Sequence, residues 1–141
     1  ALSFELAVPG SLMDIRIPKL IIQPIIENTM KYGLSGKAPW HVTVQGAAED
    51  GRWTISVRDD GPGFTEERLR ELRARIAERM EGAPEPTLSI KGMGLLNIAS
   101  RLRIYYGEEA VIRIGNDPAG GAAVVIGGTN EPSTKILGPG R

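Results

Sequence analysis

Two adjacent polar residues in an apolar run, Glu27 and Asn28, are the first candidates for chemistry in this chain. They stand in IIQPIIENTMKYG, which extends from Ile21 to Gly33. An asparagine can give Mg²⁺ a neutral oxygen ligand, and a glutamate can act as a base or orient an attacking group. Apolar residues at helical spacing, which fit an ordinary amphipathic helix equally well, are Ile22, Ile25, Ile26 and Met30. These residues alone leave both interpretations open.

A second candidate is the acidic and glycine-rich run RDDGPGF, from Arg58 to Phe64. Asp59 ends a strand-like segment, which is a rigid place to hold a carboxylate. Gly61 and Gly63 allow the backbone to turn sharply and approach a ligand closely, although a plain turn would use the same residues. Two neighbouring buried carboxylates would each raise the proton affinity of the other, so we expect Asp60 to point into solvent.

The third candidate is KGMGL, from Lys91 to Leu95, immediately before a helix-like segment. The free N–H groups and the dipole at the start of a helix suit an anionic phosphate, and Lys91 could meet the same group. A linker before an amphipathic helix is the simpler alternative. The Walker A pattern, Gly-x-x-x-x-Gly-Lys-Ser/Thr, does not occur in the sequence.

The order of these three runs resembles the N, G1 and G2 boxes of the GHKL ATPases. The wording Gln-Pro-x-x-Glu-Asn, together with LLNIASRLRIYYG after the last box, is similar to the ATP-binding domain of the LytS-like sensor histidine kinases. The resemblance extends from about Pro18 to about Ile126. It implies the Bergerat fold, with ATP and Mg²⁺ as cofactors.

The resemblance also implies a role for individual residues. Glu27 would be the general base or orient the attacking group, Asn28 would bind Mg²⁺, and Asp59 would accept a hydrogen bond from the adenine amino group. The other residues implied at the ATP site are Lys31, Tyr32, Gly61, Gly63, Lys91, Gly92, Met93, Gly94 and Leu95. Residues 64–90 would form a mobile lid over the nucleotide.

Two positions depart from the pattern of the resembled kinases, and one histidine is not expected to take part in the chemistry. Tyr32 replaces the usual His before Gly, which puts a phosphate contact from that position in doubt. Ala122 follows the paired glycines where Thr or Ser is common, so a hydroxyl near the adenine is missing. His41 starts a strand-like run and is expected to be structural, because the phosphate-accepting His of the resembled kinases lies on a helical hairpin upstream.

The function implied is the catalytic domain of a sensor histidine kinase. It would pass the γ-phosphoryl group of ATP to a His on a separate dimerisation domain of the same protein, which would be a homodimer and would serve a response regulator. Two alternatives are a degenerate nucleotide-binding module without kinase activity, and another GHKL-type ATPase or a serine protein kinase. The intact Glu27-Asn28 pair argues against the first, and the Gln-Pro-x-x-Glu-Asn wording argues against the second.

The overall composition limits the remaining possibilities. The 141 residues suit one domain, and Lys plus Arg equal Asp plus Glu at 17 each, so no net field favours nucleic acid or an acidic membrane. The chain has no Cys and one His, which excludes disulfides and a multi-histidine metal site within it. No apolar run approaches the roughly 20 residues of a membrane span. We expect a fragment of a longer protein, without membrane contact of its own, from the cytoplasmic portion of a membrane-anchored sensor.

The elements that must position these residues are predicted from periodicity and turn signals. Thr65 can cap a helix, Gly107 can end one, and Glu49-Asp50-Gly51 predicts a hairpin. The expected strands are Phe4–Val8, Asp14–Ile17, Trp40–Gln45, Trp53–Val57, Ala110–Ile114 and Ala122–Ile126, with a frayed tail over 127–141. Short turns between consecutive strands predict a mixed, mostly antiparallel sheet with helices on one face, which is an α+β two-layer sandwich.

Overall fold

The computed structural model of the protein describes residues 3–7, 25–27, 29, 33–35, 41–81 and 94–129. Its elements are β1 (Ser3–Ala7), β2 (His41–Glu49), β3 (Arg52–Asp59), α3 (Glu66–Glu81), α4 (Gly94–Tyr106), a 3-10 turn η1 (Gly107–Glu109), β4 (Val111–Asn116) and β5 (Ala122–Thr129). Residues 25–27 and 29 are helical. The predicted strand Asp14–Ile17 and most of the predicted helix around Glu27 lie outside the described residues.

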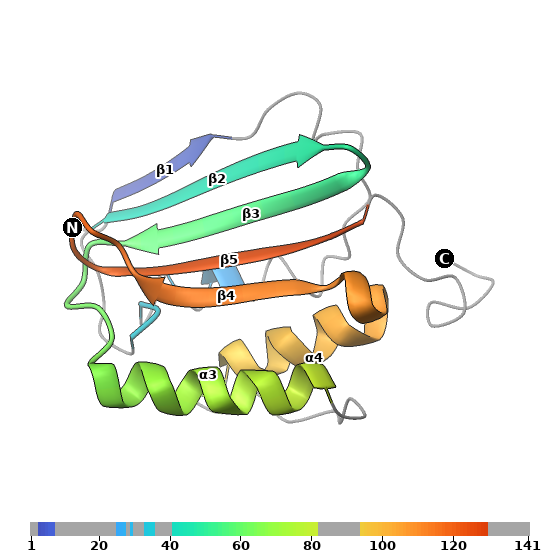
Figure 1. Ribbon diagram of the computed structural model, residues 1–141. Helices are drawn as coiled ribbons and strands as arrows, with labels where there is room; N and C mark the ends of the chain where they lie inside the picture. Colours follow the sequence, from blue (N-terminus) through green and yellow to red (C-terminus); the bar gives the residue numbers. More distant parts are fainter. Residues whose placement is uncertain are drawn as a thin grey trace.

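The strands form one sheet in the order β1-β2-β3-β5-β4 (Figure 1). β1 pairs with β2 in parallel, and the other neighbours are antiparallel, as the mixed, mostly antiparallel prediction required. The β2–β3 hairpin turns at Asp50 and Gly51, whose φ angles are 50° and 76°. Positive φ at both central residues is what a two-residue hairpin turn of type I′ needs, and Asp-Gly tolerates it.

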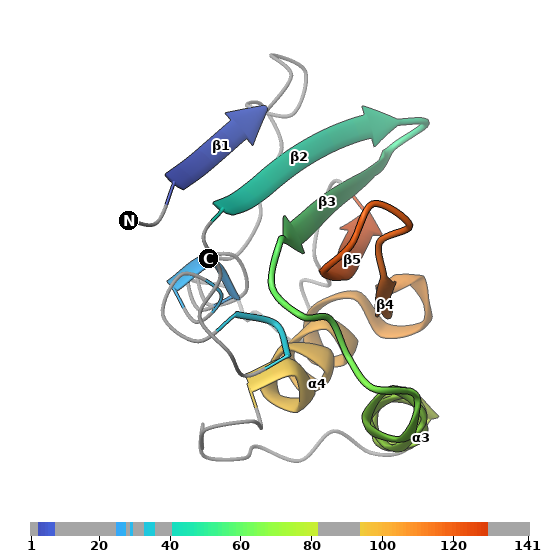
Figure 2. The ribbon, with the colours of Figure 1, turned by 90° about the vertical axis from the view of Figure 1, so that its left-hand side faces the viewer.

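Helices α3 and α4 cover one face of this sheet, which confirms the two-layer sandwich (Figures 1 and 2). Alternate residues of β3 point toward the helices because side chains change face at every strand position. The core residues that the central strands and α4 contribute are Trp53, Ile55, Val57, Val124, Ile126, Leu96, Ile98 and Leu102. The core therefore lies between the middle of the sheet and α4.

The predicted start of α3 and the predicted end of α4 are both present. Thr65 caps α3, because its Oγ1 accepts a hydrogen bond from the Arg68 N–H at 3.1 Å, and Glu66 and Glu67 occupy the first turn. Gly107 follows the last residue of α4 with a φ of 58°, the left-handed conformation expected of a helix-ending glycine. Among the described residues, no helix combines the length and hydrophobicity that crossing a bilayer requires.

Two expectations about segment boundaries were wrong. β5 continues to Thr129, so residues 127–129 belong to the sheet and not to a frayed tail. The glycines there serve packing: a Cβ on Gly128 would lie 2.7 Å from the Tyr106 ring. The second error is the start of the lid, because α3 buries Leu72 and Ile76 against the core. Residues 64–81 are thus part of the packed layer, and the prediction for residues 82–90 lies outside the described residues.

Candidate nucleotide site

The carboxylate of Asp59 is the centre of the candidate site. Asp59 is the last residue of β3 and its exposed fraction is 5 %. Its Oδ1 accepts hydrogen bonds from the backbone N–H groups of Gly61 at 3.0 Å and Ala122 at 3.1 Å. Its Oδ2 accepts one from the Leu34 N–H at 2.8 Å. Three segments far apart in the sequence therefore meet at one side chain.

These bonds leave the two carboxylate oxygens unequal. An ionised carboxylate offers about two acceptor positions on each oxygen. Oδ1 already has two donors, whereas Oδ2 has one among the described residues. Oδ2 therefore has one acceptor position that no described residue fills, and an ionised carboxylate has no hydrogen of its own to donate. A ligand bound here must present an N–H or O–H group at this point.

Gly121 permits the close approach of β5 to the end of β3. Its φ is 90°, and a Cβ built on it would lie 1.9 Å from the backbone oxygen of Asp59. No side chain fits in that space, so the paired glycines before Ala122 place the Ala122 N–H within reach of Asp59. Ala122 has no hydroxyl, but its backbone supplies the polar contact to the carboxylate.

The glycine-rich turn after Asp59 is fixed by Asn116 at the end of β4. The Asn116 Oδ1 accepts a hydrogen bond from the Phe64 N–H at 2.7 Å, and its Nδ2 donates to the Phe64 carbonyl at 2.9 Å. Gly63 has a φ of 77°, and a Cβ there would lie 2.8 Å from the same Oδ1. Gly63 of the second box therefore has a structural reason to be glycine.

Asp60 separates from Asp59 as predicted. Its side chain is exposed, and its Oδ1 accepts a hydrogen bond from the His41 N–H at 2.8 Å. The Asp60 N–H in turn donates to the His41 carbonyl at 3.2 Å. His41 is the first residue of β2, which agrees with the structural role expected for it.

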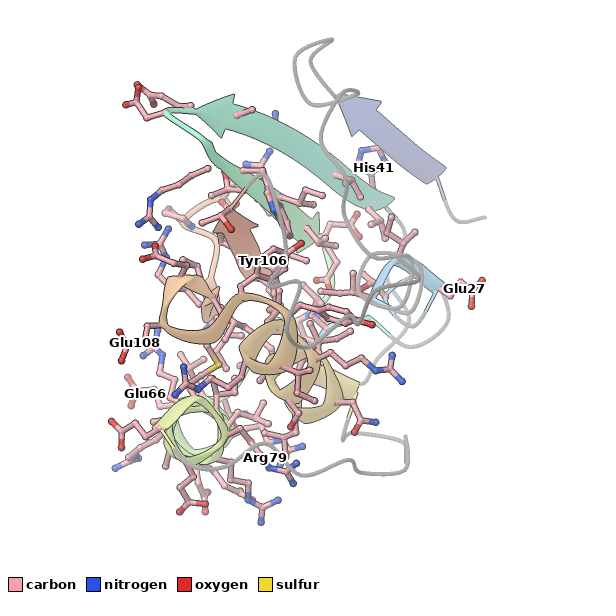
Figure 3. The ribbon with its side chains drawn as sticks, turned by 90° about the vertical axis from the view of Figure 1, so that its right-hand side faces the viewer. Glu27, His41, Glu66, Arg79, Tyr106 and Glu108 are labelled. Carbon is pink, nitrogen blue, oxygen red and sulfur yellow. The ribbon has the colours of Figure 1, made fainter. Side chains whose placement is uncertain are left out.

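The segment of the first box is tied to the same centre. Thr29 is buried, and its Oγ1 donates to the Ile25 carbonyl at 2.6 Å, while the Gly33 N–H donates to the Thr29 carbonyl at 2.8 Å. The next residue, Leu34, donates to Asp59. Glu27 is exposed and its side chain extends outward from the helical segment (Figure 3). The helix that carries Glu27 is therefore linked to the end of β3 through its C-terminal side.

The third box is described only from its second glycine onward. Gly94 is the first residue of α4, and Leu95 is buried below it at 7 % exposure. The start of α4 lies near residues 33–35 (Figure 2). The predicted site residues outside the described part of the chain are Asn28, Lys31, Tyr32, Lys91, Gly92 and Met93.

Two residues of this site were not predicted from the sequence. Leu34 acts through its backbone N–H, so its side chain carries no signal of the contact. Asn116 stands in an Asn-Asp-Pro run, which by itself is typical of a turn. An asparagine held two residues before a proline can also clamp a distant backbone, but only the fold shows which backbone it meets.

Comparison with known proteins identifies the family to which this arrangement belongs. Residues 13–128 match the family described as "Histidine kinase-, DNA gyrase B-, and HSP90-like ATPase". The chain belongs to this family, and it has the family's ATPase type of fold.

Particular relatives are sensor kinases. The chain is 31% identical to sensor histidine kinase YesM of Bacillus subtilis over 126 residues, which are 89% of this chain and 19% of YesM. It is 30% identical to sensor protein LytS of Oceanobacillus iheyensis, over 84% of this chain and 20% of LytS. The catalytic domain of histidine kinase ThkA shares the fold, with a TM-score of 0.62 and 17% identity over 94% of this chain and 82% of that domain. The chain thus spans about a fifth of the length of these two curated relatives.

Proposed function

We propose that this chain is the ATP-binding catalytic domain of a sensor histidine kinase. It would transfer the γ-phosphoryl group of ATP to a His on a separate dimerisation domain. The observation that carries the proposal is the Asp59 carboxylate, which is buried, is held by three backbone donors and has one acceptor position on Oδ2 that no described residue fills. The family match over 13–128 supports an ATPase-type use of that position.

The acceptor position on Oδ2 fits adenine. The adenine amino group is a donor and would complete the four acceptor positions of the Asp59 carboxylate. The corresponding edge of guanine presents a carbonyl oxygen, which would face a carboxylate oxygen with no hydrogen between them. We therefore expect this site to prefer ATP to GTP.

The phosphate end of the site is assigned by the sequence and lies mostly outside the described residues. Asn28 would bind Mg²⁺, which keeps several waters and phosphate oxygens and needs few protein ligands. Lys31, Lys91 and the backbone from Gly92 to Gly94 would hold the phosphates, because α4 begins at Gly94 and helix starts attract anions. Glu27 would act as the base, and positioning and charge neutralisation would supply most of the catalysis.

The relatives support partners outside this domain, because their full chains are about five times as long as this one. A histidine-containing dimerisation domain of the same protein would accept the phosphoryl group, and a response regulator would receive it next. Two proteins that share this fold have been crystallised in complexes: ShkA with AMPPNP, and ThkA with the response regulator TrrA. The full protein would be a homodimeric sensor that holds this domain in the cytoplasm.

Calorimetry with Mg-ATP and Mg-GTP tests the proposed recognition. We expect the wild-type chain to bind ATP at least tenfold more tightly than GTP, and Asp59→Asn to weaken ATP binding at least tenfold, which is about 1.4 kcal/mol. Asp60→Asn makes the same chemical change one residue later at an exposed side chain and should change ATP affinity less than threefold. Thermal unfolding of each variant shows whether the fold survives. Equal affinity of the wild type for ATP and GTP would contradict the proposed role of Asp59.

A further inference from the structure

A groove lies between α3 and β4, and Asp59 does not line it. Its volume is about 410 Å³. Its apolar lining includes Ile76 and Met80 from α3 with Ile112 and Ile114 from β4, and the charged residues that line it are Arg73 and Arg113. This volume falls within the range of pockets that bind ligands or a few side chains. Because Asp59 does not line this groove, nucleotide binding at Asp59 does not account for it.

One wall of the groove is the edge of the sheet, because β4 is the last strand in the order β1-β2-β3-β5-β4. The Asp117 N–H donates to the Gly121 carbonyl at 2.9 Å, so this pair faces β5. Antiparallel pairs alternate along a ladder, which turns the backbone groups of Ile112 and Ile114 away from β5. Arg73 agrees with this assignment, since its Nη2 and Nε donate to the Ile114 carbonyl at 2.9 and 3.3 Å.

The arginine leaves most of this edge available. It covers the Ile114 carbonyl, whereas the Ile114 N–H and both backbone groups of Ile112 have no strand partner beyond β4 in the described part of the chain. Unpaired strand edges accept an added strand, and natural proteins often guard them with charged side chains. Here the charged side chain at the edge is Arg73, and it occupies a single carbonyl group, that of Ile114.

The charge of the groove is one-sided. Arg73 and Arg113 are both exposed, and in residues 41–81 and 94–129 neither forms an ion pair with a carboxylate. By contrast, Arg68 and Arg75 on the same helix pair with Glu71. A ligand that suits the groove must therefore offer apolar side chains, carboxylates and an extended backbone.

We propose that this groove binds a short extended segment of a partner protein, with alternating apolar and acidic side chains, as an added strand beside β4. Segments of this chain are a poor match by charge: Glu85 is balanced by Lys91 in residues 82–93, and residues 8–24 and 130–141 carry more basic than acidic residues. A second copy is disfavoured because two-fold pairing of β4 would bring both sets of groove arginines to one interface.

Fluorescence anisotropy with a labelled peptide of alternating isoleucine and glutamate tests this proposal. We expect saturable binding, weakened by added salt, and little binding of the same peptide with lysine in place of glutamate. Arg113→Glu should weaken binding at least tenfold. Arg70→Glu is the matched control, because Arg70 is an exposed residue of α3 that does not line the groove. The control should change affinity less than twofold, and both variants should keep ATP affinity.

Amide chemical shifts complete the experiment, since an added strand must perturb Ile112 and Ile114 more than residues of β2. No binding of the acidic peptide at millimolar concentration would overturn the proposal, and so would equal binding of the lysine peptide. A concentration-dependent dimer that Arg113→Glu abolishes would assign the groove to a second copy instead. ATP binding is measured separately, so failure of this proposal is distinguishable from failure of the proposed function.

Discussion

At the scale of single residues, Asp59 joins recognition to folding. The same carboxylate that is proposed to meet adenine accepts N–H groups from Leu34, Gly61 and Ala122. An unsatisfied buried donor costs about 1–3 kcal/mol, so these three contacts hold the side chain in one orientation before a ligand arrives. The proposed recognition of the base is therefore preorganised by backbone groups from three segments.

The paired glycines before Ala122 give a prediction about stability. Gly121→Ala would put a Cβ 1.9 Å from the Asp59 oxygen, whereas Gly120→Ala meets no atom within 4 Å although its φ is 107°. We expect Gly120→Ala to lower the free energy of unfolding by about 1–2 kcal/mol through backbone strain alone. Gly121→Ala should lower it by more than about 3 kcal/mol. Urea unfolding measures both, and equal losses would contradict the close approach of β5 to Asp59.

Tyr106 gives a prediction about alkaline stability. Its exposed fraction is 5 %, its hydroxyl has no hydrogen-bond partner among the described residues, and burial raises the pKa of Tyr106 from 10.0 to about 12. A raised folded-state pKa favours the neutral phenol in the fold. The corresponding stability is complete below pH 10 and is lost as the pH rises toward about 12.

Tyr106→Phe isolates this contribution. At pH 7 we expect the free energy of unfolding to change by less than about 1 kcal/mol, because the variant removes a buried hydroxyl that has no described partner. Between pH 10 and 12 the wild type should lose up to about 3 kcal/mol more than the variant. Guanidinium unfolding at several pH values measures the difference, and parallel pH curves for the two proteins would refute the assignment.

At the scale of elements, the sequence predicted the turns and helix ends that depend only on residues close together in the chain. Asp50-Gly51 predicted the β2–β3 hairpin because few other pairs accept positive φ twice. Thr65 predicted the start of α3, and Gly107 predicted the end of α4. The three candidate runs around Glu27, Asp59 and Gly92 were likewise visible in the sequence, because each is short and its residues are close together in the chain.

Long-range pairing was not predictable in the same way. Nothing local to β5 says that it lies between β3 and β4, or that β1 runs parallel to β2. The contacts from Leu34 to Asp59 and from Asn116 to Phe64 depend on that pairing, so the sequence did not reveal them. Gly127 and Gly128 were predicted to belong to a frayed tail. They are glycines because the Trp53 backbone and the Tyr106 ring occupy the space of a side chain, and both of those residues lie on other elements.

Hydrogen exchange with and without Mg-ATP tests the remaining part of the predicted lid, residues 82–90. The measured segment is residues 83–93, which includes the first residues of the third box next to it. Lys91 and the N–H groups around Gly92 would gain a phosphate partner from the nucleotide, so we expect protection of these amides to rise at least fivefold. α3 is the internal control, since Leu72 and Ile76 are already packed in the core. Equal protection of residues 83–93 in both states would mean that the segment does not close over the nucleotide.

At the scale of the whole molecule, the candidate nucleotide site and the α3–β4 groove use different parts of the fold. The candidate nucleotide site is centred on Asp59 at the end of β3, and the groove lies between α3 and β4, the outer strand of the sheet. The chain matches about a fifth of the length of these relatives, and in the longer protein proposed above it would work beside other domains. Separate surfaces would allow a partner to bind without displacing the nucleotide.

Phosphoryl transfer in the longer protein tests the division of roles at the first box. This chain has one His, and His41 begins β2 with its backbone bonded to Asp60, so we expect the isolated chain to bind γ-labelled ATP without labelling itself. In the full-length kinase, Glu27→Gln should leave ATP affinity within threefold and slow transfer at least about 100-fold, the usual range for loss of a general base. Asn28→Ala should instead weaken the magnesium-dependent part of binding, because it removes a proposed metal ligand and leaves the carboxylate in place.

The two variants distinguish a general base from a metal ligand, because each variant should change a different measured quantity. Glu27 is exposed, so its substitution by an isosteric amide should not disturb the fold, and a change in transfer rate reports on chemistry. Titrating Mg²⁺ at fixed ATP gives the second measurement, in which Asn28→Ala should need more metal for half-maximal binding. If Glu27→Gln transfers phosphate at the wild-type rate, Glu27 is not the base. Stable label on His41 of the isolated chain would show that this residue accepts phosphate and is more than the first residue of a strand.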